Sequence, residues 1–123
     1  ARDVARVYQM LLNGGEIDGQ RYLSKETCQL FTTETSKISR RGLGFDKPDA
    51  DDPKKGNCAP AAPAEVYGHT GFTGTCAWVD PMNELVYVFL SNRIYPDVTN
   101  RKLNQLHIRE RIQGAIYDAM KKK

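Results

Sequence analysis

The residues with the clearest chemical potential lie in one short stretch, residues 67–75, which reads Tyr-Gly-His-Thr-Gly-Phe-Thr-Gly-Thr. The stretch places an imidazole, His69, and a hydroxyl, Thr70, directly before Gly71. An imidazole can exchange a proton near neutral pH, a hydroxyl can bind a carboxylate or carbonyl group, and a glycine lets a substrate approach the backbone closely. This stretch is therefore the first candidate for a functional site.

Two simpler interpretations compete with a functional one. Glycines at every third position (Gly68, Gly71, Gly74) are also typical of a plain glycine-rich turn, and a single histidine before a strand is more often structural than catalytic. A phosphate-binding loop fits less well, because such loops follow a strand and open a helix. This stretch follows a proline-rich segment and leads into an apolar run, which predicts a strand over residues 72–80.

The joint pattern resembles the serine β-lactamase and penicillin-binding-protein family, whose third active-site motif is Lys-Thr-Gly or His-Thr-Gly on a substrate-lining strand. Here His69-Thr70-Gly71 is followed by an aromatic-bearing strand, Asp80-Pro81, a second apolar strand and a closing helix. The histidine form is most similar to the D,D-carboxypeptidase and esterase branches. The resemblance covers nearly the whole chain and is weakest over residues 47–64.

The resemblance also implies roles for individual residues. Phe72 follows the motif glycine and would donate its backbone N–H to the oxyanion hole, with His69 as the second catalytic candidate. Thr70, Gly71 and Thr73 would form the substrate-binding set, in which the Thr70 hydroxyl meets a carboxylate or carbonyl group and Gly71 leaves room for the substrate.

The other two motifs of that family are missing from the sequence. The positions three residues after Ser24, Ser36, Ser39 and Ser91 hold Thr27, Ser39, Gly42 and Ile94, so no Ser-x-x-Lys occurs, and no Tyr-x-Asn or Ser-x-Asn occurs either. We therefore expect the chain to be the C-terminal piece of a larger serine acyl hydrolase domain, inactive without a nucleophile. Its partners would be the missing N-terminal half and, in the intact protein, a small acyl or peptide substrate. The alternative is a fragment of a non-catalytic homologue that binds cell-wall peptide or acts as a scaffold.

The first third of the chain predicts helices and one short strand. Apolar residues follow helical spacing over residues 1–13 and predict a buried face of Val4, Val7, Tyr8, Leu11 and Leu12. Gly14 and Gly15 should end this helix, and Ser24 should cap a second helix that runs to about residue 31. Residues 42–45 are a candidate strand between glycines. Residues 47–64 hold four of the six prolines and predict a loop.

The last third predicts a hairpin and a helix. Strands over residues 72–80 and 85–90 are joined by the turn sequence Asp-Pro-Met-Asn, and the second strand is apolar on both faces, which requires cover on both sides. The helix of residues 1–13 and a final helix over residues 102–120, with Ile108, Ile112, Ile116 and Met120 on its buried face, would supply that cover. The fold class is thus α+β, an antiparallel sheet flanked by helices, in one domain portion divided as 1–46, 47–64 and 65–123. Apolar surface left exposed would favour self-association.

Composition excludes several classes of function. The chain has 123 residues and a net charge of +3, and its lysines and arginines form no basic stripe with interleaved aromatics, so nucleic-acid binding is not expected. No apolar run reaches membrane-spanning length, and with two histidines and no Cys-x-x-Cys neither a metal nor a cofactor is expected. Cys28 and Cys76 should be core residues and Cys58 an exposed thiol. The residues fix no compartment, although the resemblance implies a periplasmic or secreted protein.

Overall fold

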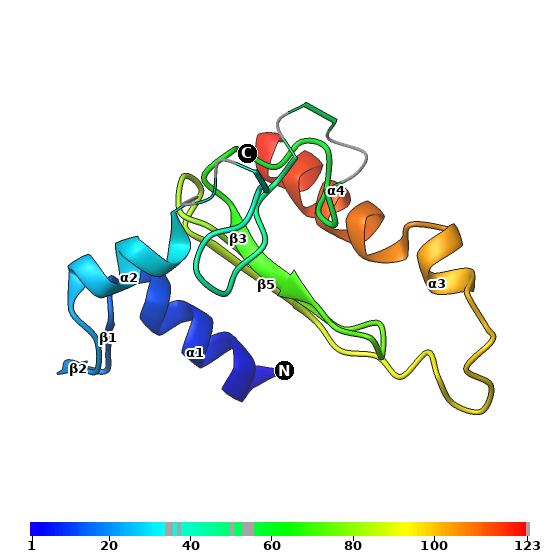
Figure 1. Ribbon diagram of the computed structural model, residues 1–123, viewed down its shortest axis with the longest axis horizontal. Coiled ribbons are helices and arrows are strands. Elements are labelled where there is room, and N and C mark those ends of the chain that lie inside the picture. Colours follow the sequence, from blue (N-terminus) through cyan, green and yellow to red (C-terminus); the bar gives the residue numbers. More distant parts are fainter. Residues whose placement is uncertain (34–35, 37, 50, 53–55, 123) are drawn as a thin grey trace.

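The computed structural model describes residues 1–33, 36, 38–49, 51–52 and 56–122. Its centre is a three-stranded antiparallel sheet in the order β3-β4-β5, with helices on both sides (Figure 1). The strands are β3 (Tyr67–Thr70), β4 (Cys76–Asp80) and β5 (Leu85–Phe89), and a small separate hairpin joins β1 (Glu16–Ile17) to β2 (Gln20–Arg21). The helices are α1 (Arg2–Leu12), α2 (Lys25–Thr32), α3 (Lys102–Gln105) and α4 (Ile108–Lys121). The predicted α+β class is confirmed.

The central strand β4 is buried along its whole length because helices cover both faces of the sheet. Trp78 pairs with Tyr87 across the ladder, so their side chains share one face, and Ile116 of α4 packs against the cluster that they form. On the opposite face the ring of Tyr67 meets Phe45 at 5.4 Å, and Phe45 meets Tyr8 of α1 at 6.1 Å. The prediction of helical cover on both sides is confirmed.

Local signals in the sequence set the ends of the first two helices. The N–H of Gly15 donates to Met10 O (2.8 Å) and that of Gly14 to Leu11 O (3.0 Å), the paired bonds of a Schellman motif. Gly14 takes the left-handed conformation that this motif needs, with φ 67°. Ser24 caps α2 by accepting from the N–H of Thr27 at 3.1 Å. Both predicted boundaries are confirmed.

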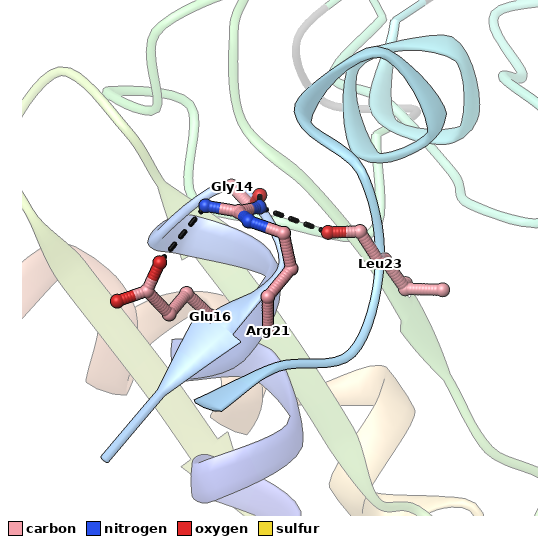
Figure 2. A network of polar contacts seen from close by, with 4 residues as sticks. All are labelled: Gly14, Glu16, Arg21 and Leu23. Atoms are coloured by element: carbon pink, nitrogen blue, oxygen red, sulfur yellow. Dashed lines mark hydrogen bonds and ion pairs between the residues drawn. The ribbon is translucent and has the colours of Figure 1, made fainter. Parts of the chain in front are cut away.

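Arg21 fastens the first hairpin to the segment before α2. Figure 2 shows its guanidinium between two backbone carbonyls and a carboxylate. Nη1 donates to Gly14 O (2.8 Å) and Leu23 O (2.9 Å), and Nη2 pairs with Glu16 at 2.9 Å. This fork of contacts joins the end of α1 to the start of α2.

Several expectations for the first half of the chain are wrong. Residues 42–45 form no strand: backbone pairing is confined to one isolated bridge between Asp46 and Gly68. On α1, Val4 and Val7 are 37% and 55% exposed, because the helix packs on the sheet through Tyr8 and the residues after it. Cys58 is 2% exposed and belongs to the core cluster, since the loop folds back over Trp78. Of the predicted loop, residues 50 and 53–55 lie outside the described residues, and the remainder forms neither helix nor strand.

The final helix differs from its prediction in continuity and in its buried face. It is broken between α3 and α4, where His107 adopts a left-handed φ of 49°. The buried side chains of α4 are Arg109, Gln113 and Tyr117, one position away from the predicted isoleucine stripe. Ile112 and Met120 are each 37% exposed. Polar partners explain the shift: Gln113 accepts the N–H of Ala59 at 2.8 Å, and Tyr117 donates to Asp80 at 2.8 Å.

Candidate functional site

The His-Thr-Gly stretch ends strand β3 and forms the turn into β4. Gly71 N donates to Thr75 O at 2.8 Å, and Gly74 N donates to Gly71 O at 2.9 Å, so residues 71–75 close a tight hairpin turn. Gly74 has a φ of 94°, which a side chain would strain. The predicted strand over residues 72–80 is therefore wrong in its first part, since β4 begins at Cys76. The motif therefore lies at the end of β3 and not at the start of β4.

His69 lies on the same face of β3 as Tyr67 and is exposed to solvent. Its Nδ1 is 2.6 Å from the carbonyl oxygen of Thr70. In the tautomer that carries the proton on Nδ1, this nitrogen donates to Thr70 O and Nε2 stays free to accept a hydrogen bond. The imidazole is thus held by the neighbouring backbone.

The outer edge of β3 is covered at one point and open at the next. Gly68 exchanges two backbone bonds with Asp46, of 2.8 and 3.1 Å. Because hydrogen-bonding groups alternate along an antiparallel strand, the N–H and C=O of Thr70 face the same outer edge. The covering segment turns away at Gly44, whose φ is 101°. Apart from the His69 ring, the described residues supply no hydrogen bond to this side of Thr70.

Phe72 and Thr73 form the tip of the turn and are held by the segment after β5. Phe72 is 71% exposed, and the guanidinium of Arg93 lies over its ring at 4.7 Å. Thr73 O accepts the N–H of Arg93 at 2.9 Å and the hydroxyl of Ser91 at 3.2 Å. These contacts follow from the pairing of β4 with β5, which returns the chain to the turn at Phe89.

A cavity of about 470 Å³ in the fold lies away from this turn, between α1, α2 and the start of β3, whereas a cavity of about 460 Å³ lies directly beside Phe72. The second cavity is lined by Phe72, Arg93, Val98, Thr99, Arg101 and Asn104. Sequence reasoning missed the two arginines and Asn104. The hairpin register could have found Arg93, because the residues directly after β5 return to the 71–75 turn. Arg101 and Asn104 belong to the start of α3, and the register does not place them.

Two kinds of site are absent from the part of the chain that the structure describes. No three His, Cys, Asp or Glu side chains there gather closely enough to hold a metal ion. None of the helices described has the length and apolar character needed to cross a membrane. What the arrangement offers is backbone and side-chain hydrogen bonding at an open strand edge.

Comparison with known proteins gives a consistent family. A family model described as Beta-lactamase matches residues 1–110. The chain is 33% identical over 102 residues to a protein of Escherichia coli O157:H7 named "Putative D-alanyl-D-alanine carboxypeptidase". It is 32% identical over 102 residues to proteins of the same name from Escherichia coli K12 and Salmonella typhi. Each match covers 83% of this chain and 23% of the relative, so the chain spans less than a quarter of the length of these curated relatives. With the family model matching most of its length, this chain belongs to the β-lactamase family.

Proposed function

We propose that this chain supplies the substrate-binding strand of a serine acyl hydrolase site, of the β-lactamase, D,D-peptidase or esterase type. The nucleophile would come from another part of the same protein, since no Ser-x-x-Lys occurs here. The observation that carries the proposal is the outer edge of β3 at Thr70, where no backbone group of the described residues pairs with the strand and only the His69 ring contacts the carbonyl. An extended acyl or peptide substrate can add to such an edge as one more strand.

Each residue of the stretch then has a chemical task. Phe72, at the exposed tip, would present its N–H to the oxygen of the acyl group, a contact typically worth about 3 kcal/mol in the transition state. The Thr70 hydroxyl would bind a substrate carboxylate or carbonyl group, and Thr73 would belong to the same substrate-binding set. Gly71 leaves the approach free of a side chain. His69 would offer Nε2, because its Nδ1 is held at Thr70 O.

Labelling with a fluorescent penicillin, read by intact mass, tests where the nucleophile lies. The 123-residue chain should form no covalent adduct, because it has no activated serine. A stoichiometric adduct on one of its serines or cysteines would overturn the assignment of the nucleophile to another part of the protein. The folded state of the labelled sample can be checked by the fluorescence of its single tryptophan, Trp78.

Amide chemical shifts test the binding edge itself. Titration with N-acetyl-D-alanyl-D-alanine should shift the amides of Thr70 and Phe72 at millimolar peptide. The affinity should be weak, because in this proposal the nucleophile and the opposite wall of the cleft would come from another part of the protein. Substituting Gly71→Ala, which places a methyl group 2.3 Å from Thr75 Oγ1, should remove those shifts. Gly114→Ala is the matched control, since no atom lies within 4 Å of its added carbon and its backbone is helical. Shifts spread over the sheet without a maximum at this edge would contradict the proposal.

A further inference from the structure

Arg109 is a buried cation that reaches from the first turn of α4 to the His-Thr-Gly turn. Its side chain belongs to a residue only 8% exposed. Nη1 donates to Thr75 O at 3.4 Å, and Nη2 donates to the side-chain oxygen of Asn104 on α3 at 3.2 Å. The guanidinium fork thus joins two helices to the base of one turn.

The carbonyl that Arg109 contacts is the one that closes the turn. Thr75 O also accepts the N–H of Gly71 at 2.8 Å, one residue before Phe72. A displacement of Thr75 would therefore move Gly71 and tilt the peptide unit that carries the Phe72 N–H. Ser91 and Arg93 fix the other carbonyl of the tip, Thr73 O. Arg109 instead contacts Thr75 O, at the end of the turn that Ser91 and Arg93 do not contact.

Arg109 has no counter-ion among the described residues. No carboxylate there lies within ion-pair distance, and its Nε has no hydrogen-bond partner. The neighbouring Glu110 forms no ion pair with it among the described residues, and Glu110 Oε2 is itself buried without a hydrogen-bond partner. Burying a charge without an ion-pair partner is energetically unfavourable in general. A neutral side chain would avoid that cost, so packing of α4 alone gives no reason for an arginine.

We propose that Arg109 is a positioning residue that holds the 71–75 turn in the geometry from which Phe72 N–H can meet an acyl oxygen. The inference rests on the proposed function for the role of Phe72, whereas the hold on the turn is independent of it. Asn104 orients the guanidinium and also lines the cavity beside Phe72. A group bound in that cavity would therefore act on the turn through Asn104 and Arg109.

Amide hydrogen exchange in the full 123-residue chain tests the hold on the turn. In Arg109→Gln the Gly71 amide should exchange at least about tenfold faster, because its acceptor loses a fixed position. Asn104→Ala should give a smaller increase, and Arg109→Lys an intermediate one, since an ammonium keeps the charge but cannot bridge both acceptors. Arg111→Gln is the control, with the same loss of charge on an exposed position of the same helix.

The pattern of exchange separates positioning from general stability. The Gly15 amide, in the Schellman motif of α1, is the internal reference and should not change. Unaltered Gly71 exchange in Arg109→Gln, or equal acceleration of Gly15 and Gly71, would overturn the proposal. If Arg109→Gln does not fold, the Gly71 exchange rate in Asn104→Ala tests the proposal instead. Asn104 is exposed, so its substitution leaves the core intact.

A parallel titration with N-acetyl-D-alanyl-D-alanine links the turn to binding. Arg109→Gln should lose the Phe72 shift, and Arg109→Lys should recover part of it. The wild-type chain could show no peptide-induced shift while Gly71 still exchanges faster in Arg109→Gln. That result would support the role of Arg109 in holding the turn and would contradict the proposed function. A Phe72 shift that persists unchanged in Arg109→Gln would overturn the link between this residue and substrate.

Discussion

The two turns at the ends of strand β4 are held in different ways. At one end, Asp80 begins the turn of residues 81–84 and closes it with its own carboxylate. Oδ1 accepts the N–H groups of Met82 (2.9 Å) and Asn83 (3.1 Å), and Oδ2 accepts the Asn83 side chain at 2.8 Å. One distant group, the hydroxyl of Tyr117, adds a bond of 2.8 Å. This turn depends mainly on neighbours in the sequence.

At the other end, the 71–75 turn depends on residues far along the chain. Its carbonyls at Thr73 and Thr75 accept from Ser91 and Arg109, which lie 18 and 34 positions away. A turn fixed by its own side chain keeps its shape wherever the sheet places it. A turn fixed by other elements is placed relative to those elements, and such placement is what a binding site requires. The candidate site lies at the second kind of turn.

Removing the Asp80 carboxylate should give the largest effect. Asp80→Ala leaves three donors of the turn without their acceptor and orphans the buried Tyr117 hydroxyl, so we expect the free energy of unfolding to fall by about 3 kcal/mol. Urea unfolding followed by Trp78 fluorescence measures it. Tyr117→Phe is the control that removes only the distant bond, with an expected loss of about 1 kcal/mol. Equal losses in the two variants would show that the turn is not self-sufficient.

Gly74→Ala should disturb the turn that is held from outside. The new methyl group would meet Ser91 Oγ at 2.6 Å, in a backbone with a φ of 94°. Left-handed strain and the steric contact together predict a loss of about 2 kcal/mol in the free energy of unfolding. Gly19→Ala, at φ 75° with open space around it, carries the strain alone and should lose about 1 kcal/mol. A Gly74→Ala chain as stable as Gly19→Ala would mean that Ser91 does not confine the turn.

The same contrast explains what the sequence could predict. The turn at Asp80-Pro81 and the helix end at Gly14 were predicted correctly, because the residues that form them are also the residues that bond. Residues 72–75 looked like a strand, since phenylalanine and threonine favour strands. The glycine spacing had pointed to the alternative, a glycine-rich turn, and Gly74 adopts the positive φ of 94° that such a turn uses. No local pattern shows that Thr73 O and Thr75 O accept from Ser91 and Arg109.

The prediction for the closing helices is wrong for the same reason. The isoleucine spacing predicted the buried face of α4, yet Arg109, Gln113 and Tyr117 are buried because each has a partner on another element. From the sequence alone, a polar residue is predicted to be exposed, because its bonding partner is not known. The family motif located the candidate site from the sequence. The groups that hold it in place came from the structure.

Alkaline pH should weaken the Cys76 end of β4 through its buried thiol. Burial raises the pKa of Cys76 to about 11, from an ordinary value of 9.0. The unfolded thiol ionises first, so the folded state binds more protons between about pH 9 and 11 and loses stability as the pH rises through that window. At pH 10 we expect a loss of about 1 kcal/mol from this thiol, measured by urea unfolding at several pH values. Cys58, whose pKa burial also raises to about 11, should contribute a similar loss. In Cys76→Ala the free energy of unfolding should therefore fall less steeply between about pH 9 and 11 than in the wild type. An unchanged dependence on pH would show that the Cys76 thiol, beside the 71–75 turn, is open to solvent.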